Sequence, residues 1–308
     1  MPSFDFITAG DGRRLRTCVA EPENPSGRVC VLLSGQTEFI EKYGEVIGEL
    51  TGRGFTVAAF DWRGQGGSER ALADPLKCHV GDFSEFDDDL NSFMAAVVAK
   101  LSPSPLVLAH SMGSHLALRA LHDHPDWFRA AVLVAPMIAV STRGYPGWLT
   151  RIITGLHSGF GKSGEFAWGM ERRDPHQITF ERQLCTSDAA RFERTQAILR
   201  AEPDIRLAGP TWGWIEAAYR SMNAMARPGY AEAIKTPTLI VGAGKDRIVL
   251  IEATRRFAAR LPHGRYIELA ESEHEILMEQ DAIRDRFWTA FDAFVADAEA
   301  TSSARSAR

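Results

Sequence analysis

The 308-residue sequence lacks the features of membrane-spanning and disulfide-rich proteins. Its four cysteines contain no Cys-x-x-Cys pair, which argues against a zinc cage and a dense disulfide framework and favours a reducing compartment. No uninterrupted apolar stretch approaches the roughly 20 residues that a membrane-spanning helix needs. The first residues lack a basic region followed by an apolar run, so we expect no secretory signal and a cytoplasmic location. Peripheral contact with a membrane stays open.

Excess positive charge is also absent. The chain has 35 Lys and Arg against 40 Asp and Glu, a net charge of −5, which argues against a surface that neutralises nucleic-acid phosphates. A composition of 45% hydrophobic and 24% charged residues is typical of a globular chain with a large core. We therefore expect a globular protein of one or two domains that does not bind nucleic acid.

Short apolar runs alternate with helical periodicity in the first and last parts of the chain. The runs lack period-two alternation, as do strands covered on both faces, and they span residues 29–33, 55–60, 106–109, 131–135, 238–241 and 265–269. Between runs, apolar residues recur every three or four positions, for example from 82 to 101, which predicts amphipathic helices. Residues 4–20 are expected to form an antiparallel hairpin. The predicted class is α/β, with a mostly parallel central sheet and flanking helices.

This alternation lapses between residues 137 and 233, where aromatic residues are scattered among glycines and arginines. We interpret 137–233 as an inserted helical cap, and 1–136 and 234–296 as the core that it interrupts. The last residues, 297–308, are rich in Ala, Ser and Arg and lack large apolar side chains, which predicts a disordered tail.

Ser111 stands at the junction of a predicted strand and a predicted helix. It is the only serine with Gly or Ala two positions before it and Gly two positions after it, namely Ala109 and Gly113. A nucleophile elbow needs such small residues because its tight turn brings these positions against neighbouring backbone. The alternative is an ordinary helix N-cap serine. The apolar strand before Ser111 favours the nucleophile.

A nucleophilic serine needs a histidine base that a carboxylate orients. In folds with this elbow, the chain order is Ser, acid, His. His274 follows the last predicted strand and so lies at the carboxyl edge of the sheet, where open parallel sheets bind ligands, whereas His263 precedes that strand. We therefore prefer His274 as the base. Asp246, after the preceding strand, is the predicted acid, with a turn aspartate as the alternative.

Acyl transfer also needs rigid N–H donors for the oxyanion. Met112, directly after the nucleophile, offers one backbone N–H, and Gln36, after the first central strand, offers another. The glycine-rich segment 61–68 lacks the Gly-x-Gly-x-x-Gly spacing of dinucleotide-binding loops, so we interpret it as a structural turn.

From residue 4 to 294 the sequence resembles α/β-hydrolases of the monoacylglycerol lipase and bacterial lysophospholipase group, often classed with serine aminopeptidases. The motifs that carry this resemblance are Gly35-x-x-Glu38 with Lys42-Tyr43, Asp61-x-Arg63-Gly64-x-Gly66-x-Ser68, His110-Ser111-Met112-Gly113, Asp246-x-Ile248-Val249 and His274-Glu275. Within the cap, the segment from Leu207 to Trp214 is similar to the lysophospholipase branch. Two positions depart from the group: Ala109 replaces its usual glycine, and Ser34 replaces the histidine of its His-Gly oxyanion motif.

The resemblance implies a serine esterase that acts on single-chain glycerolipids through an acyl-enzyme, without metal or organic cofactor. It assigns Ser111, Asp246 and His274 as the triad and Gln36 and Met112 as the oxyanion hole. A small-molecule or lipid substrate is expected to contact the cap, and the candidate binding residues are Arg143, Trp148, Trp212 and Trp214. Core packing explains the cap aromatics equally well.

Three other functions are considered. An aminopeptidase needs cap carboxylates to receive a free amine, and Glu165, Glu171 or Glu216 could serve. A general carboxylesterase shares the triad but not the lipid preference. A non-catalytic ligand receptor on the same fold is disfavoured because the three triad residues are all present.

Overall fold

The structure is a computed structural model that describes residues 3–141, 161–168 and 177–306. In this part of the chain, an eight-stranded sheet has the strand order β1-β2-β4-β3-β6-β7-β9-β10. Antiparallel pairing is confined to β1–β2 and β2–β4, and all other pairs are parallel. The strands are β1 (Ser3–Thr8), β2 (Arg14–Ala20), β3 (Arg28–Leu33), β4 (Phe55–Phe60), β6 (Leu106–His110), β7 (Ala130–Val134), β9 (Thr238–Ala243) and β10 (Gly264–Leu269).

Helices cover both faces of the sheet, which explains why its central strands are apolar throughout. In β3, Val31 and Leu33 join the core on one face, while Cys30 and Leu32 join the core on the other. The first face is covered by α2 (Ser84–Ala96), α3 (Met112–Asp123) and α8 (Ile251–Ala258), and the second by α1 (Gly44–Gly52) and α9 (Asp281–Ser306). The predicted mostly parallel sheet with flanking helices is therefore confirmed.

The predicted strands agree with the observed ones to within two residues at each end. The predicted hairpin is confirmed as β1–β2, and its turn contains Gly12 at a φ of 90°, a value that favours glycine. The helix expected over 82–101 is shorter, because α2 ends at Ala96 and a 3-10 turn, η2 (Val98–Lys100), follows.

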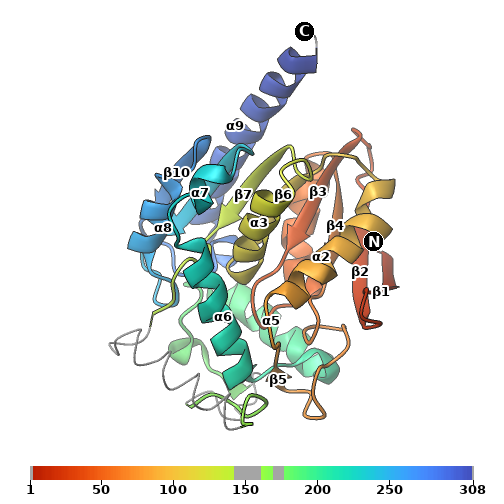
Figure 1. The fold of residues 1–308 in the computed structure, drawn as a ribbon, viewed down its shortest axis with the longest axis vertical. Helices are drawn as coiled ribbons and strands as arrows, with labels where there is room; N and C mark the ends of the chain where they lie inside the picture. Colours follow the sequence, from red (N-terminus) through yellow and green to blue (C-terminus); the bar gives the residue numbers. More distant parts are fainter. Residues whose placement is uncertain (1–2, 142–160, 169–176, 307–308) are drawn as a thin grey trace.

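The end of the chain differs from the expectation of a disordered tail from residue 297. Helix α9 continues to Ser306, and Figure 1 shows its last turns projecting beyond the sheet. Ala298 packs against the core, and the Glu299 carboxylate lies 2.9 Å from both the Arg28 and the Arg129 guanidinium. These contacts, together with the high helix propensity of alanine, account for the extension.

The segment between β7 and β9 contains the 3-10 turns η4 (Phe180–Arg182) and η5 (Pro203–Ile205), the short strand β8 (Gly209–Pro210), and the helices α5 (Ala189–Ala201), α6 (Trp212–Met225) and α7 (Tyr230–Ala233). β8 pairs with β5 (Lys77–Cys78) outside the main sheet. In Figure 1, α5 and α6 lie at the end of the sheet opposite to the projecting end of α9. None of the helices in the described ranges is long and apolar enough to span a bilayer.

Candidate active site

Ser111 is the single residue between the end of β6 and the start of α3. Its φ of 50° and ψ of −113° lie in a sparsely populated region, a conformation that costs about 1–3 kcal/mol. Three backbone hydrogen bonds hold this strained residue: its N–H donates to the Val134 carbonyl at 2.9 Å, and its own carbonyl accepts from His115 N–H at 3.0 Å and from Met137 N–H at 3.2 Å. Ser111 is the N-cap residue of α3 by position, but its hydroxyl caps no helix N–H and is therefore free to act as a nucleophile.

Gly113 allows the elbow to pack closely on the neighbouring strand. A Cβ atom at this position would lie 2.5 Å from the carbonyl oxygens of Leu33 and Ser34, both of which are backbone atoms. Ala109, two residues before the serine, is fully buried in β6 between Leu33 and Leu133. A methyl group therefore fits at the first of the two small positions but not at the second.

The structure brings the three predicted triad side chains together at the carboxyl edge of the sheet. His274 Nε2 lies 2.9 Å from Ser111 Oγ, and His274 Nδ1 lies 2.6 Å from Asp246 Oδ2. The other carboxylate oxygen of Asp246 accepts the N–H groups of Ile248 and Val249 at 2.8 and 2.9 Å, which fixes the carboxylate in place.

His263 lies at the opposite, amino end of the strands, where its carbonyl accepts the N–H of Thr238 at the start of β9. The hydrogen bonds between Asp246 and His274 and between His274 and Ser111 fix the tautomer of His274. An Nδ1–H that donates to the carboxylate leaves Nε2 as the acceptor for the serine hydroxyl proton, which is the tautomer a general base requires.

The loop that follows β3 carries the first predicted oxyanion donor, Gln36. Gln65 braces this loop by accepting Thr37 N–H at 2.7 Å and donating to the Gly35 carbonyl at 3.1 Å. Within the described residues, the N–H groups of Gln36 and Met112 donate to no protein acceptor. Both remain available to an oxyanion, and their role there stays a prediction. Ser34, at the departure from the family motif, is buried, and its carbonyl accepts Trp62 Nε1–H at 3.0 Å.

Segment 61–68 is tied to its surroundings, in agreement with its interpretation as a structural turn. Asp61 is fully buried and accepts from Gly67 N–H at 2.8 Å and Ile40 N–H at 3.0 Å, and burial raises the pKa of its carboxyl to about 6. Arg63 pairs with the buried Asp89 at 2.7 Å. The support that this segment gives to the oxyanion loop through Gln65 has no signal in the sequence.

A buried ionic cluster that the sequence analysis missed lies behind the triad. The Glu38 carboxylate accepts from Gly35 N–H and from Tyr43 O–H, and its other oxygen lies 2.8 Å from Lys42 Nζ. Lys42 also lies 2.7 Å from Glu275, the residue after the predicted base. Burial opposes the ionisation of Glu38, but Lys42 and His110 outweigh it and hold the pKa of its carboxyl well below the ordinary value.

His110 links this cluster to the triad. Its Nδ1 lies 3.1 Å from Glu38 Oε2 and its Nε2 lies 3.2 Å from the backbone carbonyl of His274. Burial alone would lower the pKa of His110, but the charge of Glu38 raises it overall. The sequence does contain a signal for this cluster, the motif Gly35-x-x-Glu38 with Lys42-Tyr43. This motif contributed to the family resemblance, but no role was predicted for its residues.

Two of the three tryptophans predicted to bind substrate, Trp212 and Trp214, lie in the protein interior. Trp214 is 6% exposed and packs against Phe83 in the main core, and Trp212 is 5% exposed and meets the ring of Trp168 at 5.3 Å. Two other candidates, Arg143 and Trp148, lie outside the described residues.

Two of the three carboxylates considered for an aminopeptidase, Glu165 and Glu216, lie within the described residues, and each is close to a basic side chain. Glu165 is a solvent-exposed side chain 3.8 Å from Lys162, and Glu216 pairs with Arg220 at 2.7 Å. Glu171 lies outside the described residues. Neither Glu165 nor Glu216 lines the cavity that Thr37 and Glu275 border.

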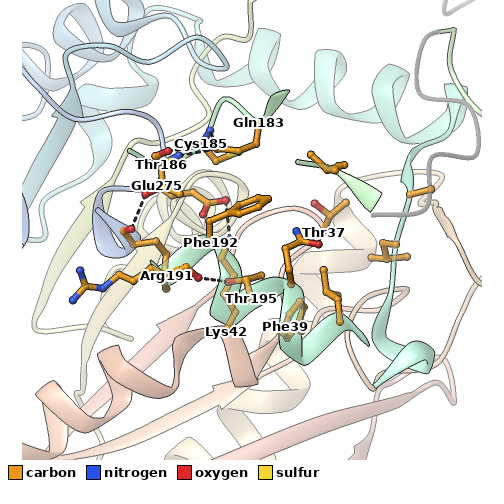
Figure 2. Close-up of a pocket in the computed structure, with 16 residues that line it drawn as sticks. Thr37, Phe39, Lys42, Gln183, Cys185, Thr186, Arg191, Phe192, Thr195 and Glu275 are labelled. Atoms are coloured by element: carbon orange, nitrogen blue, oxygen red, sulfur yellow. Dashed lines mark hydrogen bonds and ion pairs between the residues drawn. The ribbon is translucent and has the colours of Figure 1, made fainter. Parts of the chain in front are cut away.

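That cavity has a volume of about 180 Å³ and lies between α5, the oxyanion loop and the loop that carries His274 (Figure 2). Thr37 and Glu275, the neighbours of Gln36 and His274, line it, and its aromatic residues are Phe39 and Phe192. Within the described ranges, no group of three His, Cys, Asp or Glu side chains could hold a metal ion.

Known proteins resemble this chain in sequence and in fold. A family model described as "Serine aminopeptidase, S33" matches residues 24–281. The chain is 33% identical over 271 residues to lysophospholipase L2 of Escherichia coli K12, covering 83% of this chain and 77% of that protein. It is 30% identical over 266 residues to a probable lysophospholipase L2 of Haemophilus influenzae, covering 86% and 82%. The structure of a Saccharomyces cerevisiae monoglyceride lipase superposes with a TM-score of 0.76 at 18% identity, over 97% of each chain, which shows the α/β-hydrolase fold.

Proposed function

The chain belongs to the serine aminopeptidase S33 family, and from this membership and the geometry at Ser111 we propose that it hydrolyses carboxylic esters of single-chain glycerolipids through an acyl-enzyme. The observation that carries the proposal is the continuous chain from Asp246 through His274 to the strained Ser111, with distances of 2.6 and 2.9 Å. A structural serine has no need of a strained backbone or of a histidine that a buried carboxylate orients.

The first half-reaction forms the acyl-enzyme. Ser111 Oγ attacks the ester carbonyl carbon while His274 Nε2 takes the hydroxyl proton, and the carbonyl oxygen becomes an oxyanion that accepts from the N–H groups of Gln36 and Met112. The intermediate then collapses: the bond to the alcohol oxygen breaks, and that oxygen takes the proton from His274. Asp246 stabilises the imidazolium that exists between these two transfers.

The second half-reaction releases the fatty acid. Water attacks the acyl carbon while His274 removes its proton, and the same two N–H groups stabilise the second oxyanion. Collapse breaks the bond to Ser111 Oγ, which recovers its proton from His274. The enzyme returns to its initial state, and the products are an alcohol and a carboxylic acid.

The substrate class rests on the relatives, which are named lysophospholipase and monoacylglycerol lipase. The cavity lined by Thr37 and Glu275 supports it, because this space adjoins the residues that follow Gln36 and His274 in the chain. We place the protein in the cytoplasm, a proposal that its four unpaired cysteines support.

A substrate panel tests the proposal. Monoacylglycerols and lysophospholipids with one acyl chain in common are compared with the p-nitrophenyl ester of that acid and with aminoacyl anilides. We expect turnover of the glycerolipids and the ester, none of the anilides, and loss of all turnover in Ser111→Ala and His274→Ala. His263→Ala is the matched control and should retain wild-type turnover. Preferential cleavage of the anilides would favour an aminopeptidase, and undiminished turnover by Ser111→Ala would refute the mechanism.

A further inference from the structure

His274 is carried by a loop, residues 271–280, that contains little regular structure. We call it the base loop, and its only regular element is the short 3-10 turn η6 (Ile276–Met278). The residues on either side of His274 are nevertheless held by their N–H groups. Glu273 N–H donates to Glu279 Oε1 at 2.7 Å, and Glu275 N–H donates to the Cys185 carbonyl at 2.7 Å.

Both anchors lead to one stretch of chain, residues 183–188, which directly precedes α5 and which we call the bracing segment. Cys185 belongs to it, and Figure 2 shows Cys185 and Thr186 beside Glu275. Glu279 is bound to it, because its Oε2 accepts both the N–H of Ser187, at 3.1 Å, and the Ser187 hydroxyl. Thr186 adds a bond from its hydroxyl to the Met278 carbonyl at 2.7 Å.

The carboxylate of Glu279 suits this position chemically. It is fully buried, and its oxygens accept from the Glu273 N–H, the Ser187 N–H and the Ser187 hydroxyl, while Gln280 N–H approaches at 3.3 Å. Every neighbour is a donor, so the site requires a group that only accepts. An ionised carboxylate meets this requirement, whereas an amide would turn an N–H toward other donors.

We propose that Glu279 is a positioning residue for His274, which it holds in register with Ser111 by joining the base loop to the bracing segment. This inference rests on the proposed function, since it assumes that His274 is the base. The bracing segment falls in the region that the sequence analysis assigned to the cap. That region would then have a second role besides substrate contact, because it would support the catalytic histidine for every substrate.

The test uses p-nitrophenyl acetate, whose acyl group is too short to need a lipid-binding region. A displaced base slows the chemical step, so Glu279→Gln should lower kcat about tenfold and leave KM within about twofold of the wild type. Ser187→Ala removes only the hydroxyl bond and should lower kcat about threefold. Because Ser187 acts through Glu279, the double variant should match Glu279→Gln alone.

Two further variants show whether a lower kcat comes from a displaced His274 or from a less stable fold. Val295→Ala, on the buried face of α9, is the destabilised control and should retain wild-type kcat per folded molecule. Glu279→Asp keeps the acceptor oxygens and should recover part of the lost kcat. If Glu279→Gln does not fold, Ser187→Ala alone decides, because Ser187 is only partly buried.

Wild-type kcat in Ser187→Ala and Glu279→Gln would overturn the proposal, as would an effect confined to KM for long-chain esters. In either case the proposed function would stand, because the wild type would still turn over esters. A wild type without esterase activity would instead refute the proposed function.

Discussion

Gly113 gives a sharp test of the packing behind Ser111, because its replacement by alanine has two opposing effects. Gly48 lies in the interior of α1 and Gly113 is the second residue of α3, and alanine is favoured over glycine in helices by up to about 1 kcal/mol. Gly48 is exposed and has open space where a Cβ would stand, so Gly48→Ala should be stabilising. At Gly113 the new Cβ would lie 2.5 Å from two backbone carbonyl oxygens, which cannot rotate away.

The expected magnitudes follow from these contacts. Overpacking costs about 1–3 kcal/mol, and a clash with backbone atoms lies at the upper end of that range. After subtraction of the helix-propensity gain, Gly113→Ala should lose about 2 kcal/mol of unfolding free energy, whereas Gly48→Ala should gain about 1 kcal/mol. The two variants should therefore differ by about 3 kcal/mol, which is well above the error of urea denaturation followed by tryptophan fluorescence.

The same substitution should also affect reactivity. A displaced elbow moves Ser111 Oγ away from His274 Nε2, so Gly113→Ala should react more slowly with a fluorophosphonate than the wild type, and Gly48→Ala should react at the wild-type rate. A Gly113→Ala variant that is as stable and as reactive as the wild type would refute the argument that the elbow depends on close backbone packing.

Three further predictions concern the acid, the acidic pH range and the thiols. Asp246→Asn removes the acceptor that orients His274 and should lower kcat roughly 10³–10⁴-fold without unfolding the protein, as measured by ester hydrolysis and circular dichroism. The Arg191 side chain lowers the pKa of Glu45 from 4.5 to about 2, so this carboxylate stabilises the fold above pH 4.5 and ceases to do so as the pH falls toward 2. Urea denaturation should show Glu45→Gln less stable than the wild type at pH 7, with a difference that narrows below pH 4.5; a constant difference would contradict this linkage. Burial raises the cysteine pKa values, to about 11 for Cys18 and about 12 for Cys30 and Cys78, so native protein at pH 8 should react slowly with Ellman's reagent while denatured protein releases four equivalents. Rapid reaction of more than one equivalent in the native protein would contradict the burial of Cys18, Cys30 and Cys78, because only Cys185 is partly exposed.

The sheet could be predicted from the sequence because its strands are covered on both faces. Each such strand is a continuous apolar run, as in residues 28–33 and 106–110, and the helices between runs show a clear three-to-four-residue period. The positions of Ser111, Asp246 and His274 could be predicted for a related reason. In a parallel sheet, the residues that follow each strand gather at one edge, so chain order alone places them together.

The ionic cluster and the bracing of the base loop could not be predicted in this way. The bond between His110 and Glu38 joins residues 72 positions apart, and that between Ser187 and Glu279 spans 92 positions. A buried glutamate such as Glu279 has the same sequence signature as a solvated one. The tryptophans illustrate the same limit, since the aromatic content of residues 137–233 does not reveal that Trp214 packs in the core.

The whole mechanism depends on Ser111 as the nucleophile, and intact-protein mass spectrometry after fluorophosphonate treatment identifies the nucleophile. We expect one adduct per wild-type chain, located at Ser111 by peptide mapping, no adduct in Ser111→Ala, and strongly slowed labelling in His274→Ala. Equal labelling of the wild type and Ser111→Ala, or an adduct mapped to another serine, would contradict this mechanism.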